Sequence, residues 1–217
     1  VHGRRLAIVT NGGGLGVMAT DRAIDLGIEL AKLSDATIAS LDKVLPAHWS
    51  RSNPIDVLGD AAPERYKAAV NACLQDEGID GVLVMLSPQA MTDPDACAQA
   101  VIDAQQTSSK PVLACWMGQQ LIASADRLFA RHHVPCFSDP ESSVEAFACL
   151  ARFYENQQLL MQVPGPLSSH SEPDIEGARL IIESVLAENR QALTTAESRA
   201  VLHAFDIPVS LSIQCHS

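Results

Sequence analysis

The chain has 217 residues, of which 47% are hydrophobic and 19% charged, so a full hydrophobic core can form and global disorder is excluded. Its formal net charge is −11, and no cluster of Lys and Arg exceeds a pair. This balance argues against nucleic acid or an acidic membrane surface as a partner, although backbone N–H groups can still bind a small anion.

The six cysteines form no C-x-x-C pair, which favours free thiols in a cytoplasmic protein over a disulfide framework or a zinc site. No apolar run reaches the ~18 residues that a membrane span needs, and no signal peptide is visible. We therefore expect no membrane association, and we assign no metal ligand.

The first strand, turn and helix form the most distinctive stretch of the sequence. Residues 6–9 are an apolar run without alternating polar residues, which indicates a strand buried on both faces. The turn after it has glycine at four of five positions: Gly12, Gly13, Gly14 and Gly16. We expect these glycines to provide positive φ angles and room for close approach. A helix from about Leu15 then points free N–H groups at the turn, which predicts an anion site, most often for phosphate.

The G-G-G-x-G spacing matches neither the G-x-G-x-x-G fingerprint nor a P-loop, so it specifies neither a dinucleotide nor ATP. A plain strand-to-helix turn with spare glycines remains the alternative. The residues that we assign to phosphate binding are Asn11, Gly12, Gly13, Gly14, Leu15 and Gly16.

Strands and helices alternate through the next part of the chain, with short turns between them. The predicted strands after the first are 28–33, 81–86, 112–116 and 134–137. The predicted helices are 15–26, closed by Gly27, and then 34–45, 63–74, 94–107, 120–132 and 140–160, with Ser34, Asp93 and Asp139 as N-caps. A long connection, 46–63, interrupts the alternation. The pattern predicts an α/β fold, a doubly wound parallel sheet with helices on both faces.

The character of the sequence changes past residue 161. Residues 162–171 read as a linker, because they combine prolines, a glycine and serines. A helix is predicted over 175–189, followed by a second helix that Thr195 caps and that runs to about Phe205. Residues 207–209 read as the beginning of a strand.

Ligands of an open parallel sheet bind at the carboxyl ends of its strands. The loops that fall at this edge are 11–16, part of 46–60, 87–93 and 117–120, and together they form the predicted rim. The secondary rim residues are Asn53, Asp56, Ser87, Gln89 and Gly118. Such residues also serve as caps and turn formers, and this reading stays open beside a ligand or metal contact. We assign no catalytic residue, because no nucleophile lies in a recognisable motif.

Four separate stretches together resemble the NDP-forming (ADP-forming) acyl-CoA synthetases. These are residues 5–21, the Asn-Pro-Ile-Asp loop at 53–56, the Pro-Glu-Arg-Tyr helix start at 63–66, and the loop at 86–94. The resemblance covers about 4–209 and extends to the carboxy-terminal domain of the succinyl-CoA synthetase β subunit. It implies a flavodoxin-like ligase-CoA domain over 1–161, a linker over 162–171, and a helical extension with the start of an ATP-grasp domain over 172–217.

The resemblance also implies an activity. In the family, acyl-CoA, ADP and phosphate are interconverted with acid, CoA and ATP, and a phosphorylated histidine carries the phosphoryl group. The helix N-termini of two domains hold that phosphohistidine, and the turn 12–16 matches one of them. The expected ligands of the parent protein are phosphate, ADP or ATP with Mg, and CoA, with no covalently bound cofactor.

The Ser-His-Thr-Gly motif that bears the family's histidine does not occur in this sequence. The resemblance thus implies a fragment without turnover of its own. Its expected partners are the CoA-binding, phosphohistidine and ATP-grasp domains of the parent, and a homo-oligomer is left open. Similar modules also occur in protein lysine acetyltransferases, so a regulatory domain that senses acyl-CoA or nucleotide is the alternative. A plain interaction domain with structural glycines is a third.

Overall fold

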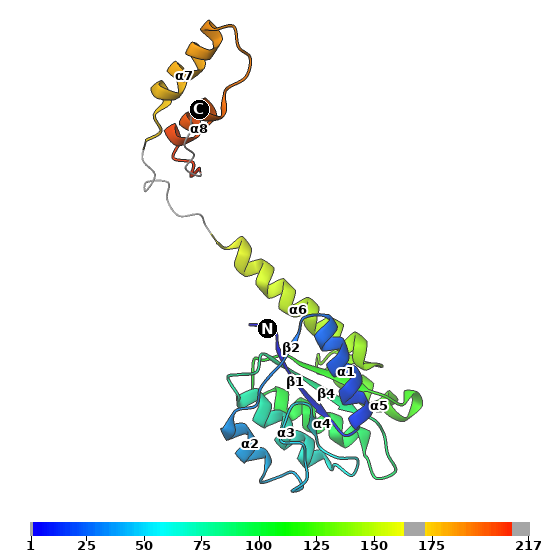
Figure 1. The fold of residues 1–217 in the computed structure, drawn as a ribbon. Coiled ribbons are helices and arrows are strands. Elements are labelled where there is room, and N and C mark those ends of the chain that lie inside the picture. The colour runs from blue at the N-terminus through cyan, green and yellow to red at the C-terminus, as the bar shows by residue number, and fades with distance from the viewer. Residues whose placement is uncertain (1, 163–171, 210–217) are drawn as a thin grey trace. The chain divides into compact units, whose positions relative to one another are not determined.

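The computed structural model describes residues 2–162 and 172–209. The chain divides into two compact units, Val1–Gln162 and Val163–Ser217 (Figure 1). All but the first residue of the predicted linker 162–171 lies outside the described residues.

The first unit is built on a parallel sheet, as predicted. Its strands are β1 (Arg5–Thr10), β2 (Glu29–Leu30), β3 (Ile55–Asp56), β4 (Gly81–Leu86), β5 (Val112–Trp116) and β6 (Cys136–Phe137). The strand order is β2-β1-β4-β5-β6, with β3 paired to β1 off this path, and every pair is parallel. Once the short β3 is set aside, this is the flavodoxin-like order, in which the chain reverses its winding next to β1.

Helices cover both faces of this sheet (Figure 1). One face is packed by α1 (Gly13–Asp25) and α6 (Pro140–Leu160), and the other by α2 (Asp35–Leu41), α3 (Pro63–Gln75), α4 (Pro94–Gln105) and α5 (Ala123–Arg131). A short 3-10 helix, η1 (Gln119–Ile122), precedes α5. The central strand β4 shows why the layers form, because Val82 and Val84 enter one apolar core while Leu83 and Met85 enter the other.

Several predicted helix boundaries are confirmed by their capping contacts. Ser34, Asp93 and Asp139 each accept a hydrogen bond from a backbone N–H in the first turn of the helix that follows. Gly27 has a φ of 68° and closes α1 in the left-handed conformation that glycine tolerates best.

The prediction of positive φ angles in the glycine turn is wrong. Gly12 has a φ of −136°, and α1 begins at Gly13 instead of near Leu15. Among the described residues, the glycines with positive φ are Gly27 and Gly118. The turn therefore needs glycine for a reason other than its backbone conformation.

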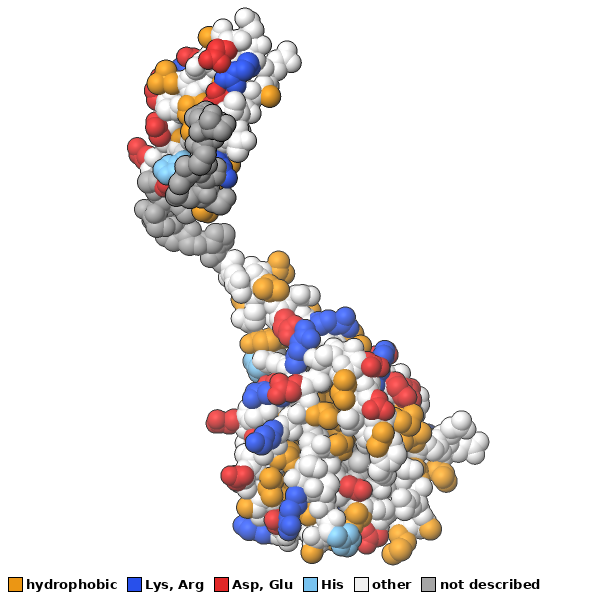
Figure 2. All heavy atoms as spheres, viewed as in Figure 1, with side chains coloured by type: hydrophobic (Ala, Val, Ile, Leu, Met, Phe, Trp, Pro, Cys, Tyr) orange, Lys and Arg blue, Asp and Glu red, His pale blue; other side chains and the backbone are white. Residues whose placement is uncertain are grey.

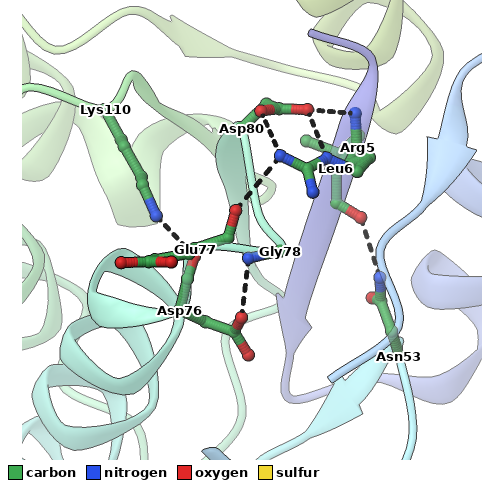
Figure 3. A network of polar contacts seen from close by, with 8 residues as sticks. All are labelled: Arg5, Leu6, Asn53, Asp76, Glu77, Gly78, Asp80 and Lys110. Atoms are coloured by element: carbon green, nitrogen blue, oxygen red, sulfur yellow. Dashed lines mark hydrogen bonds and ion pairs between the residues drawn. The ribbon is translucent and has the colours of Figure 1, made fainter. Parts of the chain in front are cut away.

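The connection 46–63 contains the strand β3, which the sequence did not predict. Both β2 and β3 lie on the same edge of β1, where β2 pairs with Arg5 and Leu6 and β3 pairs with Val9 and Thr10. The Asn53 side chain fills the gap between them. Its Nδ2 donates to the carbonyl of Leu6 at 2.7 Å (Figure 3) and to that of Ala31 at 3.0 Å, and its Oδ1 accepts from the N–H of Ile8 at 2.9 Å.

An ion pair joins the amino-terminal ends of β1 and β4 (Figure 3). The Arg5 guanidinium donates to both carboxylate oxygens of Asp80 at 2.9 Å, and to the carbonyl of Glu77 at 3.1 Å. These hydrogen bonds hold the pKa of Asp80 below its usual range. The side chain of Asp80 is only 7% exposed, so this fork fixes the register of two core strands at the edge opposite the glycine turn.

The second unit is a helical hairpin of α7 (Ile175–Ala187) and α8 (Thr195–Ala204). The N-cap of α8 is Thr194, so the prediction of Thr195 is off by one residue. Thr194 and Glu197 form a capping box, in which each side chain accepts from the other's backbone N–H. The described residues 207–209 contain no strand, contrary to the prediction. In the described part of the chain, no helix combines the length and apolar character that a bilayer crossing requires.

Candidate functional site

The loops at the carboxyl edge of the sheet come together as the predicted rim. Asn11, directly after β1, pairs with the main chain of Ser87, directly after β4. The Asn11 Oδ1 accepts from the Ser87 N–H at 2.8 Å, and its Nδ2 donates to the Ser87 carbonyl at 2.9 Å. The Asn11 residue is 4% exposed, so this pair is shielded from water.

The loop 87–93 also contacts the two other rim loops. The Gln89 side chain lies against Gly59, where an added Cβ would meet its Oε1 at 2.3 Å. Gly118, with a φ of 129°, lies under Pro88, and a Cβ there would come within 2.9 Å of the proline ring. The structure thus brings Ser87, Gln89 and Gly118 to one edge, together with the glycine turn.

The first turn of α1 leaves a small number of donors open. The N–H groups of Leu15 and Gly16 both donate to the Gly12 carbonyl, at 3.1 and 3.2 Å. Gly13 and Gly14 occupy the first two helical positions, whose N–H groups have no acceptor inside a helix. Both residues are exposed, and no heavy atom lies within 4 Å of the position of an added Cβ. The open donors of the turn are therefore those of Gly13 and Gly14.

Thr10 supports this turn, and the sequence interpretation missed it. Its Oγ1 lies 3.1 Å from both the N–H and the carbonyl of Gly12, accepting from the first and donating to the second. A threonine at the last strand position before a glycine run was the available signal, because hydroxyl side chains commonly bond to backbone two residues on.

The N-terminus of α1 also differs electrostatically from the other helices. Its first turn has no acidic residue, and Gly12 offers no side-chain cap. Every other α-helix in the described ranges has an acidic residue in its first turn. The positive end of the α1 dipole thus has no carboxylate in its own first turn to compensate it, a condition that favours a bound anion.

The arginines near the 46–60 loop are occupied by carboxylates. Arg65 donates to Asp60 at 2.8 Å and to the Val57 carbonyl at 2.9 Å, and its hydrogen bond lowers the pKa of Asp60. Arg51 donates to Asp42 at 2.9 Å. Neither of these two arginines is therefore free to bind an anion at the glycine turn.

A hollow of about 360 Å³ opens between α1 and the loop 50–56. Its lining residues are Thr10, Gly13, Gly16, Val17, Thr20, Ser50, Ser52, Pro54 and Asp56. The Oγ1 of Thr20 is buried and has no hydrogen-bond partner in the part of the chain that the structure describes. Asp56 lines the hollow and accepts from the Leu58 N–H at 2.8 Å, whereas the Asn53 amide is directed into the sheet. Of these two predicted rim residues, only Asp56 faces a space that a ligand can enter.

A larger hollow, of about 620 Å³, lies beside Asp76 and Gly78 before β4. Its buried carboxylate, Asp76, already accepts from the Ser34 N–H, the Thr37 hydroxyl and the Gly78 N–H. Size alone therefore does not make it the better site. Within residues 2–162 and 172–209, no group of three or more His, Cys, Asp and Glu side chains could hold a metal ion.

A family model for the Ligase-CoA domain matches residues 6–160. The chain belongs to the NDP-forming acyl-CoA synthetase family. It is 35% identical over 205 residues to acetate–CoA ligase [ADP-forming] I of Archaeoglobus fulgidus, which covers 94% of this chain and 28% of that relative. It is 32% identical over 159 residues to the α subunit of acetate–CoA ligase [ADP-forming] II of Pyrococcus furiosus, covering 71% of this chain and 35% of that subunit.

Solved structures of this family share the fold. The apo dinucleotide-forming acetyl-coenzyme A synthetase 1 of Ca. Korarchaeum cryptofilum aligns with a TM-score of 0.69 at 31% identity, covering 74% of this chain and 36% of that one. The same enzyme in complex with phosphate and ADP aligns with a TM-score of 0.68. This synthetase-family chain spans about a third of the length of these relatives, and the relatives are longer proteins or separate subunits.

Proposed function

We propose that this chain is the phosphohistidine-docking module of an NDP-forming acyl-CoA synthetase. The observation that carries the proposal is the open N-terminus of α1, where Gly13 and Gly14 are exposed and the first helical turn has no acidic residue. A phosphoryl group on a histidine of another domain would accept from these donors.

The relatives support the overall reaction. Those described above are named as ADP-forming acetate–CoA ligases, and one solved relative is in complex with phosphate and ADP. In the parent protein, acyl-CoA, ADP and phosphate would be converted to acid, CoA and ATP, or the reverse, with Mg accompanying the nucleotide. This chain would bind and orient the phosphoryl group and contribute no catalytic side chain, since its contacts to the group are backbone donors.

Apolar side chains beside the turn fit a docking role. Val17 and Met18 follow the glycines on α1 and are 60% and 44% exposed, and Figure 2 shows apolar side chains on the face that α1 forms. Met91, on the rim loop 87–93, is 82% exposed, and Leu121, in η1, is 71% exposed. A domain that presents a phosphohistidine would cover such apolar groups while the phosphoryl group reaches the helix N-terminus.

The test uses bulky substitutions in the full-length parent. Gly13→Leu and Gly14→Leu should fold, because, apart from the adjacent residues and the backbone of α1, no atom of the described chain lies within 4 Å of either Cβ position. Each should lower ADP-forming acyl-CoA synthetase turnover by about 100-fold or more, because the leucine side chain would block the phosphoryl group from the N–H groups and so have the effect of losing a transition-state donor. The matched control, Asp25→Leu, adds the same side chain to an exposed position at the far end of α1 and should leave turnover unchanged.

Normal turnover in both glycine variants would contradict the proposal. A regulatory sensing module and a plain interaction domain make a different prediction. In either case, the purified parent would have no synthetase turnover before any substitution is made.

A further inference from the structure

We propose that Asn11 is a positioning residue of the docking site, which aligns the N–H groups of Gly13 and Gly14 through its two-way pairing with Ser87. This inference rests on the proposed function. It assigns to Asn11 a role that differs from direct contact with the phosphoryl group.

The contacts of the Asn11 amide carry the first step. Its oxygen and its nitrogen both bond to the main chain of Ser87, and the residue is only 4% exposed. An amide engaged in this way does not extend toward solvent, where the N–H groups of Gly13 and Gly14 are open.

The rigidity of the partner carries the second step. Ser87 directly follows β4, a central strand that is buried along all six residues and paired on both sides. The pairing therefore anchors the end of β1 to the most constrained strand of the sheet. By contrast, the Thr10 hydroxyl bonds to Gly12, two residues away, and so holds the turn to β1 but not to a second strand.

The need for such an anchor follows from the glycines. Three consecutive glycines, 12–14, have more conformational freedom than any other residues, and freedom in the donors reduces affinity for the anion. Asn11 is the residue that joins this run to the strand. An anchor there orients the donors before the anion arrives.

The experiment uses the whole 217-residue chain and sulfate as the probe, with binding followed by the amide NMR shifts of Gly13 and Gly14. Asn11→Ala should raise the sulfate concentration at the titration midpoint of these amides about tenfold or more. The corresponding loss in binding free energy is about that of one charge-assisted hydrogen bond. The control, Tyr66→Phe, removes the buried hydrogen bond from the Tyr66 hydroxyl to the Met85 carbonyl and should leave the midpoint unchanged.

The isosteric variant N11D provides a rescue that general destabilisation would not produce. A protonated carboxyl can donate to the Ser87 carbonyl and accept from the Ser87 N–H, as the amide does, whereas the carboxylate can only accept. Lowering the pH from about 7 to about 4, where a carboxyl with the ordinary pKa of about 3.9 is close to half protonated, should restore part of the sulfate shifts in N11D. Sulfate stays dianionic over this range. Because the chain passes its isoelectric point of about 4.9, wild type also gains sulfate affinity, and rescue means that N11D gains more than wild type.

The outcomes separate the two claims. If wild type shows no sulfate shifts at Gly13 and Gly14, the anion site of the proposed function is overturned together with this inference. If wild type binds and Asn11→Ala binds with the same midpoint, the site stands and the positioning role is overturned. Equal weakening in Tyr66→Phe, or no recovery of N11D at low pH, also overturns the positioning role.

Discussion

The side chain of Asn11 and the main chain of Ser87 form a reciprocal pair, with hydrogen bonds of 2.8 and 2.9 Å between residues 76 apart in sequence. The pair lies just past the ends of β1 and β4. There the Asn11 side chain bonds to the main chain of Ser87, as a neighbouring strand's main chain would do within the sheet. The glycine turn and the loop 87–93 are consequently held together before any ligand or partner is present.

Alanine at Gly14 should stabilise the fold, whereas alanine at Gly118 should destabilise it. The helical backbone at Gly14 suits alanine, and no atom lies within 4 Å of the new Cβ. We expect Gly14→Ala to raise the free energy of unfolding by about 0.4–1 kcal/mol, measured by urea denaturation. Gly118→Ala is the counterpart and should lower it by more than about 1 kcal/mol, because φ is 129° and Pro88 is 2.9 Å away. A destabilised Gly14→Ala would contradict the assignment of open space.

Asn53 should prove to be a stability residue of the sheet. Asn53→Ala removes the acceptor for Ile8 and the donor for the Leu6 and Ala31 carbonyls. Leaving these buried backbone groups unpaired should lower the free energy of unfolding by about 2–3 kcal/mol. The neighbouring exposed Ser52→Ala is the control, for which urea denaturation should show a change within about 0.5 kcal/mol. An equal effect of both variants would rule out the bridging role.

The Arg5–Asp80 fork should contribute to the acid sensitivity of the first unit. Because Arg5 lowers the pKa of Asp80 in the folded state, the pair stabilises the fold above the unfolded carboxyl pKa of about 3.9. That contribution is lost as the pH falls through the folded pKa. Asp80→Asn should lower the free energy of unfolding by about 1–3 kcal/mol near neutral pH. On acidification, the free energy of unfolding of this variant should fall less than that of wild type.

Urea denaturation at several pH values checks this prediction, with the exposed Asp25→Asn as the control. If the free energy of unfolding of wild type and of Asp80→Asn fell equally with decreasing pH, the fork would not contribute to the acid sensitivity.

The helical hairpin should have its own acid transition. Hydrogen bonds from Arg190 and from the Thr194 N–H lower the pKa of Glu197 to about 2. The order that they confer is complete above the unfolded glutamate pKa of about 4.3 and is lost as the pH falls toward 2. Amide NMR shifts of α8 should follow this window in wild type. In Glu197→Gln the shifts should be independent of pH there, and an unchanged titration would exclude Glu197 as the cause.

The sequence predicted the sheet and most of the helix starts because their signals are local. The run 81–86 is apolar throughout, and Asp93-Pro94 and Asp139-Pro140 combine an N-cap with a proline in the first turn. The strand β3 was missed because it has two residues and depends on Asn53, whose partners lie 45 and 47 residues earlier in the chain. No window of neighbouring residues contains that information.

For the candidate site, topology predicted which loops meet at the edge of the sheet but could not assign the roles of their residues. Parallel strands bring their carboxyl ends to one edge, and this rule placed Ser87, Gln89 and Gly118 correctly at the rim. It could not distinguish Asn11 and Asn53, which bond to the backbone of the sheet, from donors that face solvent, because that depends on side-chain direction. The conformation of the glycines was wrong for a related reason. A run of glycines can serve either to allow positive φ angles or to leave room for a group that approaches the backbone. Only the structure shows which of the two applies.

The empty surroundings of Gly13 and Gly14 have a consequence for mutational scanning. A screen that selects this chain for stability would rank substitutions at both positions as neutral or beneficial, since nothing in the fold opposes them. A screen of the parent for growth on synthetase activity would reject the same substitutions. Subtracting one map from the other would outline the footprint of the incoming domain, with these two glycines at its centre.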